Sequence, residues 1–140
     1  MPLSHHTLIA WKRADDLFIK LHRLSFKAFP AFEQFELGRQ LRRAAFSVAV
    51  NIVEGFGRPA GRGRLNFLNI SQSSLAEVGY CLHVALRLGY VSQERAAECE
   101  IEIKQVGAPL AGLIRSEHAN ARLRMGGALL VFAYVLVRLS

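Results

Sequence analysis

Apolar side chains recur at helical rather than strand spacing in four segments of the chain. In the segment over about residues 36–54, the apolar positions step by four, four, three and four residues, as on one buried face of an α-helix. These positions are Leu37, Leu41, Ala45, Val48 and Ile52. The segments over about residues 11–28, 64–88 and 93–110 repeat with the same period. Since no strand-like alternation competes, the pattern predicts four amphipathic helices.

The predicted core positions of the other three helices follow the same period. In the first helix they are Trp11, Ala14, Phe18, Leu21 and Ala28, with Leu17 and Leu24 beside them. In the third they are Leu65, Leu68, Ser71 or Gln72, Leu75, Val78, Leu82 and Ala85. In the fourth they are Ala96, Cys99, Ile103, Val106 and Leu110. Small residues fill the middle of the third helix and allow a neighbouring helix to approach closely.

Proline and glycine mark the predicted ends of the first two helices. Pro30 ends the first helix, because a proline disfavours the helical conformation of the residue before it. The triplet Gly55-Phe56-Gly57 is predicted to stop the second helix. Residues 58–64 then form a glycine-rich basic loop that is expected to be flexible.

The fourth helix has a clear start and an ambiguous end. Gly89 suits the position just after the third helix, and Ser92 can cap the first turn of the fourth. Gly107 and Pro109 predict a kink or an early break farther along.

Four helices with short links indicate an all-α fold, an antiparallel up-down-up-down four-helix bundle. The bundle is assigned to residues 1–121. Residues 122–140 are assigned to an apolar C-terminal extension whose structure the pattern leaves open.

Charge adds a preference for phosphate-bearing partners. The chain has 18 Lys and Arg against 11 Asp and Glu, a net charge of +7, and residues 1–64 hold most of the excess. Fourteen of the cations are arginine, whose planar guanidinium matches phosphate oxygens. The candidate nucleic-acid-binding residues are Arg39, Arg42, Arg43, Arg58, Arg62 and Arg64.

Polar residues near the end of the second helix allow two interpretations. Asn51 lies beside the buried stripe, and Glu54 can pair with Arg58 four residues on. With Gly55 and Gly57 they either shape the loop for a ligand or fix the corner of the bundle. The structural interpretation is favoured, because a lone Glu without an acid–base partner supports no reaction.

Catalytic and metal chemistry finds little support in the residues. Cys81 and Cys99 have no metal-ligand spacing and are expected to be buried and reduced, and the five histidines do not pair on one helix face. We therefore expect no catalytic residue, no metal and no cofactor.

The N-terminus does not resemble a signal peptide, which favours a cytoplasmic protein. The uncharged run 126–137 is shorter than the ~18 residues of a membrane-spanning helix, so a membrane is not an expected partner.

A longer motif resembles that of a known protein family. The run 40–58, QLRRAAFSVAVNIVEGFGR, closely resembles the pattern Q-x-R-R-A-x-x-S-I-x-x-N-I-A-E-G-x-G-R of a bacterial protein family. Its members are four-helix-bundle proteins encoded in intervening sequences of large-subunit ribosomal RNA genes. Four further runs agree: W-x-x-A at 11–14, F-P-x-x-E-x-x-x-L at 29–37, F-L with S-L-x-E at 67–77, and L-G-Y at 88–90. Ser71-Gln72-Ser73 replaces the family's A-x-G, and neither Pro109 nor the apolar tail from Met125 has a counterpart.

The resemblance implies a fold and an assembly rather than an activity. Family members form homopentamers with a basic surface, and a related bundle is the accessory partner of reverse transcriptases in diversity-generating retroelements. The expectation is a non-enzymatic basic oligomer, pentameric by resemblance, that binds structured RNA through the six arginines. The alternative is a protein adaptor that docks an acidic partner such as a reverse transcriptase or another polymerase. A third hypothesis, membrane attachment, depends on residues 126–137 alone. That tail is open to three explanations: an altered reading frame, a membrane-surface segment or an oligomer contact.

Overall fold

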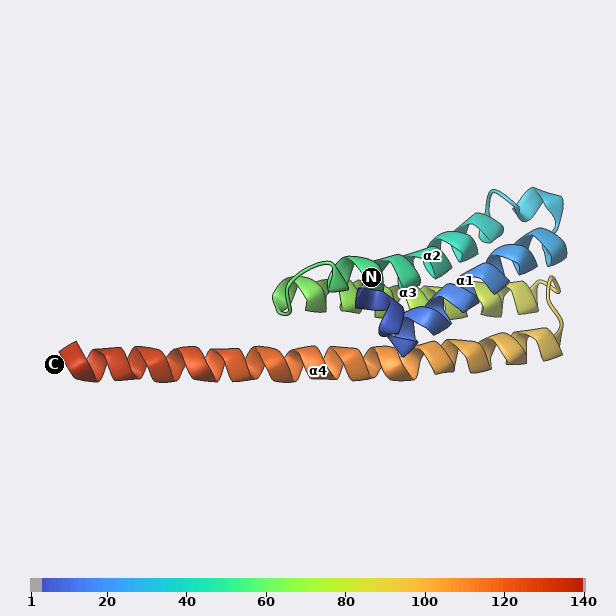
Figure 1. Ribbon diagram of the computed structural model, residues 1–140. Coiled ribbons are helices and arrows are strands. Elements are labelled where there is room, and N and C mark those ends of the chain that lie inside the picture. The colour runs from blue at the N-terminus through green and yellow to red at the C-terminus, as the bar shows by residue number, and fades with distance from the viewer. Residues whose placement is uncertain (1–3, 140) are drawn as a thin grey trace.

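Four antiparallel helices make up the chain, in a computed structural model that describes residues 4–139 (Figure 1). They are α1 (Ile9–Ala28), α2 (Leu37–Phe56), α3 (Arg62–Arg87) and α4 (Gln93–Leu139). Short 3-10 helices precede α1 (Ser4–Thr7) and α2 (Ala31–Glu33). Each helix packs on the next in sequence, and α4 also packs on α1, which closes the bundle. The predicted all-α up-down-up-down bundle is confirmed.

The core follows the predicted stripes, with a shift in α1 and with several predicted positions only partly buried. These positions are Trp11, Ala28, Leu37, Leu65, Ala96 and Ile103. The buried side chains of α2 include Leu41, Ala45, Val48 and Ile52, as the four-residue steps predict. In α1 the core is formed by Ala10, Ala14, Leu17, Leu21 and Ser25. Leu17 therefore takes the place predicted for Phe18, which is half-buried on the flank beside α2.

Small residues bring α2 and α3 together. The buried Ser71 donates a hydrogen bond from Oγ to the carbonyl of Val48 at 2.7 Å. The hydroxyls of Ser47 and Ser74 lie 2.7 Å apart and share a second hydrogen bond. The buried position on α3 is thus Ser71 rather than Gln72, and close helix approach through small residues is confirmed.

The predicted signals between α3 and α4 are confirmed. Gly89 has a φ of +77°, and its N–H bonds to the carbonyl of Leu86 at 3.0 Å. The N–H of Tyr90 reaches back to the carbonyl of Ala85 at 2.8 Å, which completes a Schellman motif. The hydroxyl of Ser92 accepts the N–H of Arg95 at 3.1 Å and caps α4.

The predicted break in α4 is wrong. The helix runs without interruption through Gly107 and Pro109 to Leu139. Val106 and Leu110, on either side of Pro109, are completely buried and hold the backbone in the bundle despite the N–H that proline lacks.

Beyond the bundle α4 projects alone (Figure 1). Glu117 is its last buried residue, and all described side chains from Arg122 to Val137 are exposed. The extension predicted for residues 122–140 is therefore a helix continuous with α4 over its described part.

Candidate nucleic-acid interface

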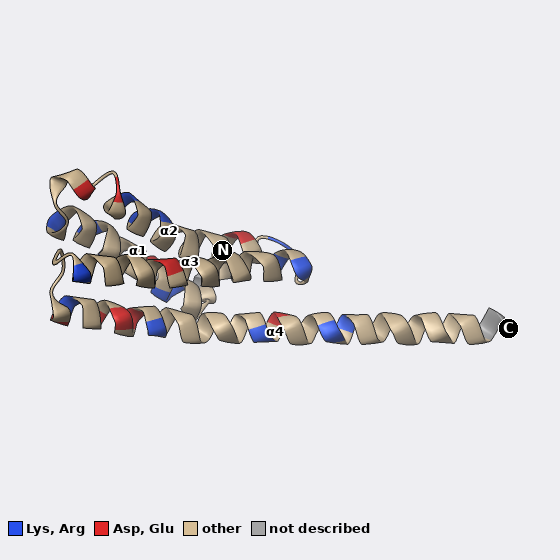
Figure 2. Ribbon diagram, turned by 180° about the vertical axis from the view of Figure 1, so that it is seen from behind, with Lys and Arg blue, Asp and Glu red and all other residues tan. Residues whose placement is uncertain are grey.

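The six candidate arginines lie in two groups at opposite ends of α2 (Figure 2). Arg39, Arg42 and Arg43 are in its first two turns, whereas the other three flank the turn from α2 to α3. Since a helix rises 1.5 Å per residue, the groups are about 20 Å apart. The structure therefore gives two basic regions rather than one cluster.

Arg42 is occupied by contacts within the fold. Its guanidinium donates to Ser25 Oγ at 2.9 Å and to the carbonyl of Gln34 at 2.6 Å. It also lies 4.2 Å from the ring centre of Phe26. Partial burial, followed by the charge of neighbouring Arg39, lowers the pKa of Arg42 below its usual value. Arg42 thus joins the end of α1 to the start of α2.

Gly38 is required for this arrangement. A Cβ atom at Gly38 would lie 2.9 Å from the carbonyl oxygen of Glu33 and 3.0 Å from Nη1 of Arg42. Any side chain there would displace the backbone or the guanidinium.

The other two arginines of this region are exposed. Arg39 lies 5.8 Å from the centre of the Phe35 ring, a loose cation–π contact, and Arg43 projects from the next turn. Both guanidinium groups are accessible to a phosphate.

Arg64 is the most heavily engaged arginine at the other end. Its Nη1 pairs with Oε1 of Glu117 at 3.1 Å, and the two side chains are only 18% and 6% exposed. It also donates to the carbonyls of Gly55 at 3.3 Å and Arg58 at 2.9 Å, and it covers the Phe56 ring at 4.3 Å. Arg64 therefore connects α2, α3 and α4.

The loop predicted to be flexible is held by α4. The N–H of Gly61 donates to Oε2 of Glu117 at 3.3 Å, and Arg124 donates to the carbonyl of Ala60 at 2.5 Å. Gly61 has a φ of +140°, a conformation that favours glycine. The loop is also shorter than predicted, because α3 begins at Arg62.

The predicted Glu54–Arg58 pair is confirmed. Nη1 of Arg58 lies 2.9 Å from Oε2 of Glu54, with both side chains about half exposed. The guanidinium also lies 4.2 Å above the ring of Phe67. Arg62 is exposed in the first turn of α3. Arg58 and Arg62 are thus the accessible cations of this turn.

Asn51 has a structural position. Its amide donates to the carbonyl of Ser47 at 2.8 Å and to Ser47 Oγ at 3.0 Å, and Ser47 in turn bonds to Ser74 of α3. These contacts agree with the structural interpretation of Asn51, although they lie along α2 rather than at its corner.

The triplet Gly55-Phe56-Gly57 stops α2 as predicted, since the helix ends at Phe56, two residues beyond the predicted end near residue 54. A Cβ at Gly55 would lie 3.3 Å from both the carbonyl oxygen of Arg64 and Cβ of Phe67, so this glycine allows α3 to approach. Gly57 caps the helix, with its N–H bonded to the carbonyl of Val53 at 2.9 Å.

Glu117 and Arg124 are the residues of this region that the sequence did not predict. Both lie on the part of α4 beyond the expected break. The steps from Leu110 to Ile114 and from Ile114 to Glu117 are four and three residues, which is the helical period. That period alone could have placed Glu117 in the core. A carboxylate at a core position signals a buried cation partner.

The two cysteines are free and buried, as predicted. Burial raises the pKa of both thiols, and the nearby Glu77 raises that of Cys81 further. Among residues 4–139 no three His, Cys, Asp or Glu side chains gather as metal ligands would. That the protein needs no metal or cofactor stays a prediction.

Comparison with known proteins now decides the family. The model of the family described as 23S rRNA-intervening sequence protein matches residues 6–112. The chain belongs to this family. Comparison with curated proteins gives no match.

A solved relative has the same fold. It is described as a protein of unknown function from the S23 ribosomal protein family of Bacteroides thetaiotaomicron, and it is 19% identical to this chain with a TM-score of 0.71. The match covers 76% of this chain and 96% of that one. At this identity the likeness concerns the bundle fold alone. The family match ends at residue 112, so the outer part of α4 lies beyond it.

Proposed function

We propose that this member of the family is a non-enzymatic basic bundle that binds structured RNA through arginine–phosphate contacts. The observation that carries the proposal is the presentation of exposed guanidinium groups at both ends of α2. Arg39, Arg43 and Arg62 are exposed, and Arg58 is half-exposed and paired with Glu54. Guanidinium groups neutralise phosphates without reading sequence, which suits a shape-specific RNA ligand.

The proposal rests on these four arginines. Arg42 and Arg64 are engaged in the fold, so a phosphate would have to compete with their existing partners. Arg42 and Arg64 instead stabilise the two ends of α2 from which the exposed arginines project.

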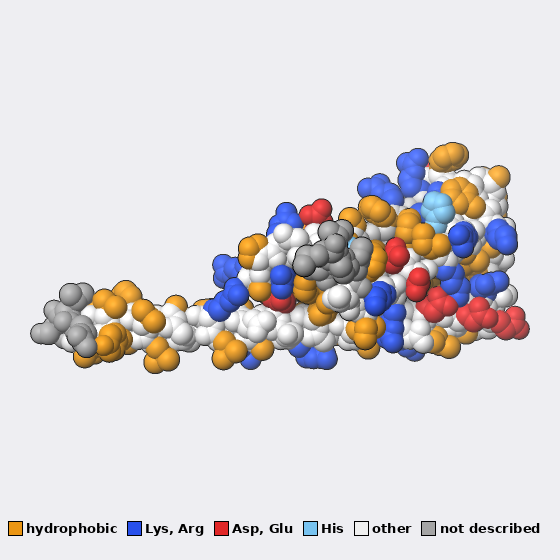
Figure 3. Space-filling model, in the orientation of Figure 1, with side chains coloured by type: hydrophobic (Ala, Val, Ile, Leu, Met, Phe, Trp, Pro, Cys, Tyr) orange, Lys and Arg blue, Asp and Glu red, His pale blue; other side chains and the backbone are white. Residues whose placement is uncertain are grey.

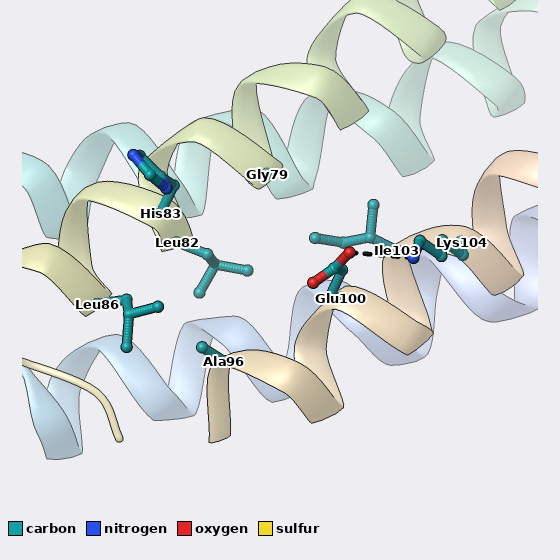
Figure 4. Close-up of a pocket in the computed structure, with 8 residues that line it drawn as sticks. All are labelled: Gly79, Leu82, His83, Leu86, Ala96, Glu100, Ile103 and Lys104. Atoms are coloured by element: carbon teal, nitrogen blue, oxygen red, sulfur yellow. Dashed lines mark ion pairs between the residues drawn. The ribbon is translucent and has the colours of Figure 1, made fainter. Parts of the chain in front are cut away.

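We also propose that the protein is a homo-oligomer, with five subunits by resemblance. Two apolar surfaces on opposite sides of the bundle support this. Between α1 and α2, the rings of Phe18 and Phe46 lie 5.6 Å apart, and Phe46 is 53% exposed. Between α3 and α4 lies a hollow of about 430 Å³ beside Gly79 (Figure 4). A ridge and a hollow on opposite faces suit a head-to-tail contact, which forms a ring when the rotation between successive subunits closes.

The hollow between α3 and α4 has room for an apolar side chain of another copy. Nothing lies within 4 Å of a Cβ at Gly79, and Leu82, Leu86 and Ile103 form apolar walls. The ion pair of Glu100 and Lys104, with 3.0 Å between the charged atoms, lies at its edge (Figure 4).

A protein adaptor is the second candidate function. The same exposed arginines can dock an acidic partner such as a reverse transcriptase, and charge complementarity acts in both cases. Affinity for RNA and its dependence on salt separate the two.

The test measures binding of a fluorescently labelled RNA hairpin at several salt concentrations. The variant R39Q/R43Q/R62Q removes three exposed cations and leaves the contacts of Arg42 and Arg64 in place. Each phosphate contact contributes about 0.7–0.9 to the slope of log K against log salt, so the variant should bind more weakly with a flatter slope.

A charge-matched control is R87Q/R95Q/R115Q, which removes three exposed arginines from α3 and α4. It should bind RNA nearly as the parent does. Equal losses in both variants would mean diffuse attraction to a cationic protein. Unchanged binding in the first variant, or no RNA binding by the parent, would favour the adaptor.

A further inference from the structure

Within residues 4–139, no other element covers the outer part of α4. Residues 125–137, here called the apolar extension, carry exposed side chains throughout, and Leu130 and Val137 are 74% and 76% exposed. Figure 3 shows these hydrophobic side chains along the free end of the helix. An apolar surface of this extent on a protein marks a site of contact with another phase or molecule.

We propose that the apolar extension inserts into a lipid bilayer and anchors the bundle to an anionic membrane. The inference goes beyond RNA binding and does not depend on it. By length and composition, α4 contains a stretch of 18 residues that is apolar enough to cross a membrane and holds at most two charged side chains.

The distribution of apolar residues around the helix selects lipid over a protein groove. Residues 128–137 are ten successive residues without a charge, and Tyr134 has the only polar side-chain group among them. At 3.6 residues per turn they cover every direction around the axis. A helix that docks in a groove or lies flat on a membrane surface keeps a polar face, whereas a helix surrounded by hydrocarbon does not.

The backbone agrees with this environment. Gly126 and Gly127 lie inside the helix, with nothing within 4 Å of either Cβ position. Exposed glycines disfavour a helix in water. In hydrocarbon the backbone must satisfy its own hydrogen bonds, so the helical state is strongly favoured there.

Length and charge are consistent with insertion. The 13 residues of the apolar extension form a helix of about 20 Å, against a hydrocarbon thickness of about 30 Å. Arg122 and Arg124 precede the segment. Arginine stems can lie in hydrocarbon while their guanidinium groups reach the headgroups, which extends the span that a short segment can occupy. Anionic headgroups attract the same arginines.

The bundle does not need this segment. The family match ends at residue 112, and the last buried residue is Glu117. The apolar extension is therefore an addition to the family fold rather than part of its core.

The test is flotation of the full chain with vesicles of phosphatidylcholine and phosphatidylglycerol, in low salt and in 1 M NaCl. The chain should float in both, because insertion is hydrophobic. The variant V131E/V135E places two carboxylates in the apolar extension and should reduce the vesicle-bound fraction at least about tenfold. The control I101E/A108E adds the same two charges to the part of α4 that belongs to the bundle, at side chains that face solvent. It should float like the parent.

Three results would overturn the proposal. One is failure of the full chain to float. Another is release by 1 M NaCl, which indicates adsorption through arginines only. The third concerns V131E/V135E. If this variant no longer floats and also forms a smaller oligomer in light scattering, the apolar extension is assigned to contacts between copies. Circular dichroism of each variant verifies that the bundle is folded.

Discussion

Glu117 and Arg64 show how one buried ion pair fixes a basic surface. The carboxylate accepts from the guanidinium through one oxygen and from the N–H of Gly61 through the other. It thereby joins the tip of the α2–α3 turn to α4. Removing either charge leaves the other largely buried without a counter-charge, which costs more than the intact pair contributes.

Replacing Glu117 should therefore destabilise the bundle strongly. We expect Glu117→Gln to lower the free energy of unfolding by about 3 kcal/mol, measured by urea denaturation, because Arg64 keeps a charge that the glutamine does not balance. Glu54→Gln is the matched control, since it breaks the half-exposed pair with Arg58. Its cost should stay below about 1 kcal/mol. Equal costs would contradict a structural role for the buried pair.

The thiols of Cys81 and Cys99 give stability a dependence on alkaline pH. Burial raises both pKa values in the folded protein, so between the unfolded and folded pKa values the native state binds more protons. The two thiols contribute fully to the free energy of unfolding below about pH 8.5, the pKa of a thiol in the unfolded chain. This contribution is lost as the pH rises through their pKa values in the folded protein.

The free energy of unfolding should thus fall as pH rises above about 8.5. The double variant C81A/C99A should show a shallower fall, whatever its stability at neutral pH. Urea denaturation from neutral to alkaline pH measures both slopes. Identical slopes in parent and variant would contradict the assignment.

At the scale of the elements, two glycines of the bundle have different surroundings, and only Gly55 lies where α2 and α3 approach closely. Gly55 faces the start of α3, where a Cβ would lie 3.3 Å from backbone and side-chain atoms. Gly79 faces open space on the other side of α3. The two positions have the same residue type and opposite surroundings.

Alanine at these two positions should have effects of opposite sign. Gly55→Ala should cost about 1–3 kcal/mol, because the backbone of α3 must move to accept the methyl group. Gly79→Ala should stabilise by about 0.5–1 kcal/mol, because alanine favours a helix and meets no neighbour. Thermal or urea denaturation measures both, and destabilisation by Gly79→Ala would contradict the open surroundings.

The helices themselves could be predicted from the sequence, because their apolar period is local. The stripe of α2 and the Gly89–Ser92 signals needed only neighbouring residues. The course of α4 could not be predicted from Pro109, since the burial of the turns on either side of it is a tertiary effect. The site was predicted least well. Whether Arg42 or Arg64 is free depends on partners such as Gln34 and Glu117, and Glu117 is 53 residues away from Arg64.

At the scale of the whole molecule, the proposed ring leads to a test of assembly. Phe46 is exposed on the α1–α2 face and contacts Phe18 of the same chain. Phe46→Glu should convert the oligomer to smaller species in multi-angle light scattering at micromolar concentration. The change should leave helix content intact, because the residue is outside the core. A stable monomer for the parent would end the oligomer proposal.

The unbroken course of α4 through Pro109 also has a mechanical consequence. One continuous helix carries core residues such as Leu110, the side chains of Glu117 and Arg124 that bond to the α2–α3 turn, and the apolar extension. Glu117 precedes Met125 by eight residues, an axial rise of about 12 Å. A partner that binds the outer end of α4 would therefore hold the bundle through one continuous helix, and the α2–α3 turn with Arg62 lies at the end of the bundle nearest to that partner (Figure 1). The arginines at the start of α2 lie at the opposite end of the bundle, so a given change in the tilt of α4 would displace them farthest.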